Sequence, residues 1–230
     1  DFLPELPPAD VPLPEPYYFL GDSQRSVIER RPLPALAPYA AHLPGWVPHK
    51  RIAEALGFGT AGIDAAVERF GPGYVWASEF ENVHSTWDVV EPPFVFRGVA
   101  FRGSEQLFQM QKQPEDTWTE DYVRRFAAST PGGAYALGRE CRLRADWDTA
   151  RVEAMRVALR HKFCGAAATI QNARPPTMSR AALRALLVAT AGRPLVSVKH
   201  DAFWGAGAGR PSRGANKLPL LLEELREELR

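Results

Sequence analysis

The sequence predicts an α+β fold, mainly helical with a small sheet, preceded by a proline-rich N-terminal extension. Of 230 residues, 45% are hydrophobic and 24% charged, which is ordinary globular composition. Eleven of the 21 prolines come before Arg51, a density that excludes a regular helix or central strand there. From Tyr74 onward, short apolar runs alternate with segments of helical spacing. We therefore divide the chain into an extension over residues 1–73 and a single domain over residues 74–230.

The first elements follow from glycine breaks and short apolar runs. In the extension, short helices are predicted over residues 51–56 and 62–70. In the domain, strands are predicted over the apolar segments, with Arg97-Gly98 as the turn between the second and the third. These strands cover residues 74–76, 94–96 and 99–101.

Capping residues predict where the helices of the domain begin. Ser104 caps a helix that runs from Glu105 to about Lys112. The pair Thr130-Pro131 begins another helix, which ends near Glu140. The longest helix begins at Asp146, with a buried stripe of Val152, Met155, Leu159 and Phe163. Further elements are a helix over 179–189, a strand over 195–198, and a C-terminal helix with leucines 218, 221, 222, 225 and 229 on one face.

Composition argues against several functional classes. A net charge of +1 provides no strong field for long nucleic acids. The two cysteines, Cys141 and Cys164, are expected to be buried free thiols, which fits a reducing compartment. Residues 1–10 lack the features of a signal peptide, and no apolar run is long enough to span a membrane, so a cytoplasmic or nuclear location is expected. The five histidines lack metal-ligand spacing, and neither a metal nor a cofactor is expected.

A glycine-rich segment near the C-terminus carries groups suited to a nucleoside. Within Asp201–Gly207, Asp201 can accept hydrogen bonds from ribose hydroxyls and Trp204 offers a flat face to a base. Gly205 allows close approach of the backbone, and Asn216 follows in the Gly214–Leu218 segment. The alternative is a loop with a purely structural role.

A polar stripe lies on the helix that begins at Glu105. Gln109 and Lys112 follow at helical spacing on the same face. The stripe fits a catalytic surface, but also a solvated face whose carboxylate is stabilised by the helix dipole. Trp147 fits a core anchor as well as a stacking platform, and the position of Lys162 near a helix C-terminus is favourable for a cation in any case.

Several short motifs occur in a fixed order. They are Phe80-Glu81-Asn82-Val83, Glu105–Lys112, Leu137-Gly138-Arg139, Trp147-Asp148, Lys162-Phe163, Asp201–Gly207 and Gly214–Leu218. Over residues from about 76 to 230 the chain thereby resembles the NADAR/YbiA-like superfamily. It departs from the family pattern at Gln106 (histidine), Leu107 (aromatic), Ser197 (glutamate in many members) and Pro219 (glycine).

The resemblance implies a YbiA-like fold and hydrolysis of an N-glycosidic bond. The substrate would be a small phosphoribosylamino-pyrimidine of riboflavin synthesis, or an ADP-ribosylated guanine. The guanine would be either free or a base within a nucleic acid. We expect Glu105 to stabilise the oxocarbenium-like charge at the ribose, with Asp201 holding hydroxyls or acting as a second carboxylate. Lys112 would either bind phosphate or attack the sugar carbon as an amine. The expected substrate-binding residues are Asn82, Arg102, Gln109, Trp147, Lys162, Trp204, Gly205 and Asn216, with Arg139 as a further phosphate contact.

Two other functions stay open at this point. A binding module would recognise ADP-ribose or a nucleotide without cleaving it. A scaffold would act through the proline-rich extension, which could bind a protein partner. The enzyme hypothesis requires the helix of Glu105 and the loop of Asp201 and Trp204 to converge on one pocket. The sequence does not predict the oligomeric state.

Overall fold

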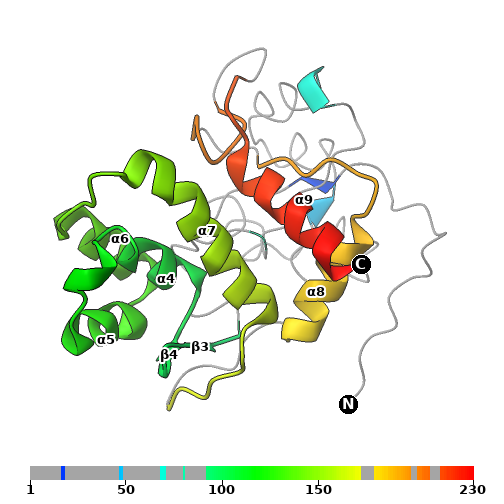
Figure 1. The fold of residues 1–230 in the computed structure, drawn as a ribbon. Coiled ribbons are helices and arrows are strands. Elements are labelled where there is room, and N and C mark those ends of the chain that lie inside the picture. The colour runs from blue at the N-terminus through cyan, green and yellow to red at the C-terminus, as the bar shows by residue number, and fades with distance from the viewer. Residues whose placement is uncertain are drawn as a thin grey trace, which may run out of the picture. The chain divides into compact units, whose positions relative to one another are not determined.

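A computed structural model places the chain in two compact units. Unit 1 comprises Asp1–Phe80 and Ala185–Arg230, and unit 2 comprises Glu81–Arg184. The structure describes residues 17–18, 47–48, 68–70, 80, 92–171, 179–197, 201–207 and 213–230. Helices dominate these residues (Figure 1), and the predicted mainly helical α+β class is confirmed. The predicted division at residue 73 stays a prediction.

Some predicted elements of the extension lie outside the described residues. These are the helix over 51–56, most of the helix over 62–70, and the strand over 74–76; residues 68–70 are helical. Where the extension is described, β1 (Tyr17–Tyr18) pairs antiparallel with β2 (Val47–Pro48). Strands of this length suit a segment in which proline removes backbone donors.

Unit 2 contains a β-hairpin that forms as the sequence predicted. Strand β3 (Phe94–Phe96) pairs antiparallel with β4 (Val99–Phe101). The turn residues Arg97 and Gly98 have φ angles of 49° and 76°. Positive φ at both central residues gives the backbone twist that a two-residue hairpin needs.

Helix α4 (Ser104–Met110) lies at the centre of unit 2, where all seven of its residues are buried. It contacts α5, α6, α7 and β4. Its boundaries differ from the prediction: Gly103 is the N-cap, Ser104 is already helical, and the helix ends two residues before Lys112. The extended backbone of Gly103 begins the helix one residue earlier than the sequence predicted.

Two helices follow α4 in unit 2. After a 3₁₀ turn, η3 (Glu115–Thr117), helix α5 (Glu120–Ala128) was not predicted, although Thr119 accepts a hydrogen bond from the Tyr122 amide as its N-cap. Helix α6 (Pro131–Glu140) begins as predicted, with the Thr130 side chain accepting from the Gly133 amide.

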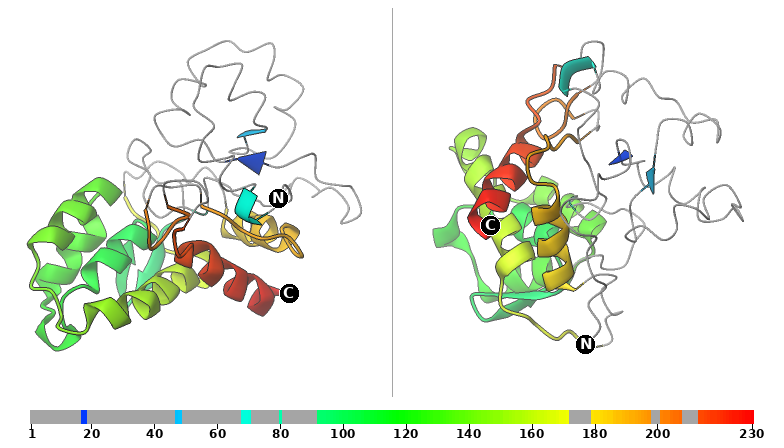
Figure 2. Two further views of the ribbon diagram at one scale, coloured as in Figure 1. Left: turned by 90° about the horizontal axis from the view of Figure 1, so that it is seen from above. Right: turned by 90° about the vertical axis from the view of Figure 1, so that its right-hand side faces the viewer.

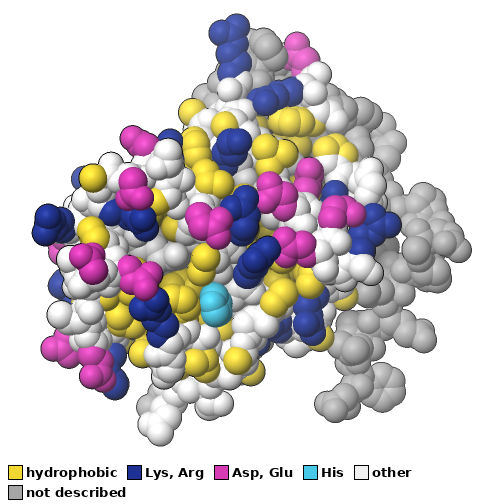
Figure 3. Space-filling model, in the orientation of Figure 1, with side chains coloured by type: hydrophobic (Ala, Val, Ile, Leu, Met, Phe, Trp, Pro, Cys, Tyr) yellow, Lys and Arg dark blue, Asp and Glu magenta, His cyan; other side chains and the backbone are white. Residues whose placement is uncertain are grey.

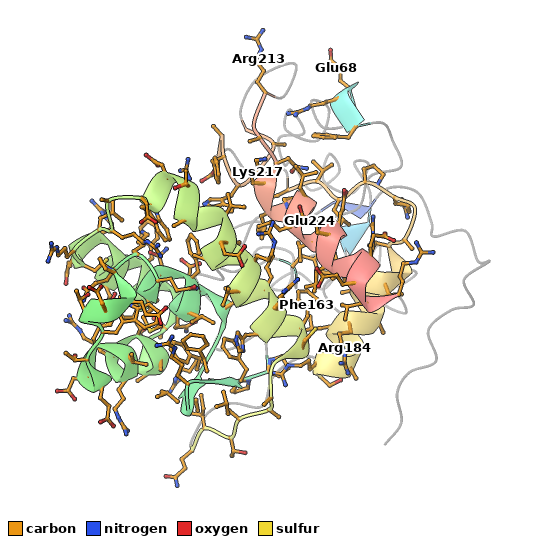
Figure 4. All side chains as sticks on the ribbon, in the orientation of Figure 1. Glu68, Phe163, Arg184, Arg213, Lys217 and Glu224 are labelled. Atoms are coloured by element: carbon orange, nitrogen blue, oxygen red, sulfur yellow. The ribbon has the colours of Figure 1, made fainter. Side chains whose placement is uncertain are left out.

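The longest helix, α7 (Trp147–Cys164), begins after Asp146 as predicted. Met155, Leu159 and Phe163 (labelled in Figure 4) are buried, whereas Val152 is partly exposed. The expectation of two buried thiols is wrong. Cys141 is half-buried at the C-cap of α6, and Cys164 is exposed at the end of α7.

Helices α8 (Arg180–Ala189) and α9 (Lys217–Leu229) lie side by side in Figures 1 and 2. On α9, leucines 218, 221, 222 and 225 are buried as predicted, and Leu229 is partly exposed. The buried Arg226 guanidinium donates to the carbonyls of Thr190 (2.9 Å) and Arg193 (2.8 Å). Arg226 thereby satisfies carbonyl groups left open beyond the end of α8.

The predicted strand over 195–198 is not a regular strand where it is described. Glu223 accepts a hydrogen bond from the Leu195 amide, and Asn216 bonds the Leu195 carbonyl and the Ser197 amide. Leu195 itself forms a single β-bridge, so strand-like pairing in the described part of this segment is limited to one residue. Among the residues of known placement, no helix is long and apolar enough to cross a membrane.

Candidate active site

Glu105 and Gln109 form a buried pair on one face of α4. Both side chains are 3% exposed, and Gln109 Nε2 donates to Glu105 Oε1 at 2.7 Å. The residues are one helical turn apart, so the bond follows from the backbone geometry that predicted the stripe. A hydrogen bond to a charged acceptor in a buried position fixes the direction of the Glu105 carboxylate.

Gly138 allows α6 to approach this pair closely. A Cβ atom at Gly138 would lie 2.1 Å from Gln109 Oε1 and 3.1 Å from Gln109 Cδ. Within the described part of the chain, Gln109 Oε1 has no hydrogen-bond partner, and it faces the Cα of Gly138. The glycine of the Leu137-Gly138-Arg139 motif is therefore needed for the amide of Gln109 to keep its place.

Lys112 follows α4 and is half-buried. Burial lowers the pKa of Lys112, and the nearby charge of Arg139 lowers it further, while Cys141 and Glu105 oppose the shift. The ammonium lies 5.9 Å from the ring centroid of Tyr135. A lowered pKa raises the fraction of neutral amine near neutral pH, which is the form that acts as a nucleophile.

Tyr122 and Cys141, near Lys112, were not identified from the sequence. The Tyr122 hydroxyl donates to the Met110 carbonyl at 2.8 Å, and burial raises the pKa of that hydroxyl. Burial also raises the pKa of the Cys141 thiol, although Lys112 opposes the shift. Both groups are therefore held in their neutral forms. Helical spacing could have placed Tyr122 on an inward face had α5 been predicted.

Other predicted site residues of unit 2 have mixed roles. Arg102 is half-buried, and its Nε has no hydrogen-bond partner among the described residues. The Trp147 ring packs 5.5 Å from that of Phe108 at 46°, which supports the core-anchor interpretation. Lys162 is 1% exposed, and its carbonyl accepts from Arg180 Nε. Gln106, at the family's histidine position, donates to the carbonyl of Ser129 at the end of α5 (2.9 Å).

In unit 1, the Asp201–Gly207 segment forms a turn held by its own carboxylate. Asp201 is exposed, and its Oδ1 accepts from the amides of Phe203 (2.8 Å) and Trp204 (2.6 Å). The Trp204 ring is half-exposed and meets the Phe203 ring edge-on at 4.8 Å. Asp201 thus has a structural task even before any ligand is considered.

The same turn caps the N-terminus of α9. The carbonyls of Phe203, Trp204 and Gly205 accept from the amides of Lys217, Leu218 and Asn216. Such amides at a helix start have no partner within the helix. Figure 4 labels Lys217 at this end of α9 and Glu224 further along it. The amides of residues 216–218 are therefore bonded within unit 1.

Asn216 has a structural role in this arrangement. It is 3% exposed, and its φ of 53° lies in the left-handed region that asparagine tolerates. Its Oδ1 accepts from the Ser197 amide at 3.1 Å, while its Nδ2 donates to the Leu195 carbonyl at 3.0 Å. Gly214 is equally constrained, because a Cβ there would lie 2.3 Å from the carbonyl carbon of Ala206.

The structure thus groups the predicted residues in two places. Glu105, Gln109 and Lys112 come together in unit 2, with Arg139 acting on Lys112. The turn from Asp201, including Trp204 and Gly205, joins Asn216 in unit 1. Their convergence on one pocket stays a prediction, and Asn82 lies outside the described residues. Over the described ranges, no cluster of three or more histidine, cysteine, aspartate or glutamate side chains could hold a metal ion.

The sequence matches the family model of the NADAR domain over residues 69–230. The chain belongs to the NADAR domain family. The N-glycosidase YbiA of Escherichia coli (strain K12) is 37% identical over 140 residues, 60% of this chain and 76% of that protein. An N-glycosidase of Nostoc punctiforme is 37% identical over 108 residues, 45% of this chain and 58% of that protein.

The chain is also similar to a riboflavin biosynthesis protein and to a solved structure. A riboflavin biosynthesis protein of Vibrio vulnificus is 34% identical over 135 residues, 57% of this chain and 32% of that protein. The NMR structure of Escherichia coli YbiA has a TM-score of 0.48 and 35% identity, covering 66% of this chain and 77% of the other. The predicted reaction class, hydrolysis of an N-glycosidic bond, is confirmed at the level of the family.

Proposed function

We propose that this NADAR protein hydrolyses the ribose C1–N bond of a phosphoribosylated aminopyrimidine or an ADP-ribosylated guanine. One observation carries the proposal. The Glu105 carboxylate is buried and held at 2.7 Å by Gln109, and it lies close enough to Lys112 to affect the pKa of that amine, which burial lowers. A fixed carboxylate and an amine with a lowered pKa are the two groups that the reaction needs at the sugar carbon.

Glu105 is assigned to the charge that develops at the ribose. Breaking the C1–N bond leaves positive charge on C1 and the ring oxygen, and a fixed carboxylate stabilises it. Because Gln109 already holds the carboxylate, little reorganisation is needed when the charge appears. The base leaves with the bonding electron pair and takes up a proton.

Lys112 is assigned to attack on C1. The neutral amine forms a bond from Nζ to C1 as the C1–N bond to the base breaks. The bond from C1 to the ring oxygen then opens, that oxygen takes a proton, and an imine remains between Lys112 and the sugar. Water hydrolyses the imine, which frees the sugar aldehyde and restores the amine. The lowered pKa of Lys112 favours this role over phosphate binding.

The remaining groups are assigned to substrate binding. The buried Nε–H of Arg102 lies three residues before Glu105 and would be satisfied by a phosphate oxygen. In unit 1, Asp201 and Trp204 are proposed as the ribose and base contacts, although Asp201 Oδ1 already accepts from the amides of Phe203 and Trp204. On the face seen in Figure 3, acidic and basic side chains are interspersed, which favours a small substrate over a long nucleic acid.

Base release from the two substrate classes, followed by chromatography, tests the function. Glu105→Gln preserves an oxygen that can accept from Gln109, so we expect loss of turnover with a nearly unchanged melting temperature. Asp116→Asn, at an exposed carboxylate of the same unit, is the matched control and should keep full activity. Unaltered turnover in Glu105→Gln would remove Glu105 from the mechanism.

Borohydride trapping during turnover tests the Lys112 step. Reduction of the imine leaves a stable secondary amine, so the peptide containing Lys112 should gain the mass of the reduced sugar. Lys112→Arg should abolish the adduct. Base release without an adduct at Lys112 would reassign this residue to phosphate binding. Tight ADP-ribose binding without base release would instead support a non-catalytic binding module.

A further inference from the structure

Tyr135 on α6 is a large aromatic side chain that the fold leaves in contact with solvent. It is 51% exposed, a level that few large apolar side chains reach in the described part of the chain. Its ring centroid lies 5.9 Å from the Lys112 ammonium. Tyr135 was not identified from the sequence, since it lies on α6 and outside the polar stripe of α4.

The surroundings of Tyr135 contain the charged groups already assigned to the reaction. Arg139 follows one helical turn later on the same face of α6, and its charge acts on Lys112. The charge of Glu105 raises the pKa of Lys112. An exposed aromatic ring, a guanidinium and a carboxylate therefore lie around the Lys112 amine within unit 2.

We propose that Tyr135 stacks the purine or pyrimidine base of the substrate and so determines its preference for an aromatic leaving group. This inference rests on the proposed function, in which Lys112 attacks the adjacent sugar carbon. Tyr135 takes the stacking role in unit 2 that the sequence assigned to Trp147, whose ring packs instead on Phe108.

Distances support this placement. A base stacked on the Tyr135 ring lies about 3.5–4 Å from the ring plane, and the ribose C1 is one bond from the base. An amine 5.9 Å from the ring centroid is therefore within reach of C1 after a change of side-chain rotamer. A neutral Lys112 amine also loses its attraction to the ring face, which leaves that face open to the base. Arg139 is suitably charged to bind the phosphate.

Binding of GMP and of ribose 5-phosphate, measured by calorimetry, tests the inference directly. The two probes share the sugar phosphate and differ in the base. Replacing Tyr135 by alanine or leucine should weaken GMP binding about 5- to 150-fold, as expected for loss of one stacked base. Both variants should change ribose 5-phosphate binding less than about 2-fold, and Tyr135→Phe should bind both probes like the wild type. Leu143→Ala, at another exposed apolar position, is the control.

The outcomes separate this inference from the proposed function. Equal loss for both probes, no loss in the alanine and leucine variants, or wild-type binding of GMP no tighter than that of ribose 5-phosphate would overturn the stacking role. If the wild type releases base while Tyr135→Leu keeps its KM and kcat, the inference fails alone. If the base-dependent loss is found but no base is ever released, the proposed function fails and the stacking role stands.

Discussion

Replacement of Gly138 by alanine tests how the candidate active site is held together. The added Cβ would lie 2.1 Å from Gln109 Oε1 and 3.2 Å from Gln109 Cβ, distances at which the Gln109 side chain has to move. Its Nε2 then leaves Glu105 Oε1, which it meets at 2.7 Å in the native arrangement. The substitution therefore acts on Glu105 through Gln109, without touching the carboxylate itself.

The size of the effect follows from two opposing contributions. Loss of a buried hydrogen bond to a charged acceptor costs about 1.5–3 kcal/mol. Alanine in place of glycine inside a helix returns about 0.5–1 kcal/mol. We therefore expect a net destabilisation of about 1–2 kcal/mol, or a fall in melting temperature of roughly 2–8 °C for a chain of this size. The rate of base release should fall by more than the loss of folded protein explains, because the Glu105 carboxylate loses its fixed direction.

The matched control lies on the same helix. A Cβ at Gly132 meets nothing within 4 Å, so Gly132→Ala should leave base release unchanged and stability equal or slightly higher. Combining Gly138→Ala with Gln109→Ala gives a double-mutant cycle, in which most of the cost of the glycine substitution should disappear. Equal melting temperatures and equal base release for the two glycine variants would refute this account of Gly138.

Three further predictions concern other parts of the molecule. Asn216→Ala should cost about 2–4 kcal/mol in urea titrations, because two buried backbone groups lose their partner, and Asn216→Gly should cost about 1 kcal/mol less, because glycine accepts the positive φ; equal losses would contradict this. Burial, and then the charge of Arg180, lowers the pKa of His161 in the folded state below its ordinary 6.5. The unfolded chain therefore binds more protons at His161, stability falls as the pH drops from 6.5 through the folded pKa, and His161→Leu should show a smaller loss in urea titrations between pH 7 and pH 5. For Lys112, base release should rise with pH through its lowered pKa, and Arg139→Gln should move that rise to higher pH in pH–rate profiles; an unmoved rise would remove Arg139 from the surroundings of Lys112.

Helices and turns were predicted correctly where the residues that begin or end them lie within the element or next to it in the sequence. The Arg97-Gly98 hairpin needs only two residues with positive φ, and α6 begins with a threonine and a proline that act within one turn. Helix α7 was predicted from a long periodic stripe. In each case the interactions that decide the element are close in sequence, so the sequence alone was sufficient.

Interactions between distant segments explain what the sequence did not predict. In the segment from Leu195, the hydrogen bonds to Asn216 and Glu223 join residues that are far apart in the sequence. The polar stripe of α4 was identified from spacing, but its burial follows from contacts with α5, α6 and α7. Tyr135 was missed because its proximity to Lys112 depends on how α6 packs against α4.

The two groups of family motifs differ in what their residues do inside the protein. In the C-terminal motifs, Asp201 and Asn216 direct their polar atoms to backbone groups, and the turn carbonyls cap α9, so substitution there should first reduce stability. In the α4 motif, Gln109 directs its amide to the Glu105 carboxylate, and burial acts on the pKa of Lys112. A stability cost is expected wherever a motif residue bonds backbone, whereas a loss of chemistry at constant stability is expected at Glu105 and Lys112. The ratio of lost activity to lost stability therefore distinguishes residues that react from residues that hold the fold, even though both belong to the same family motifs.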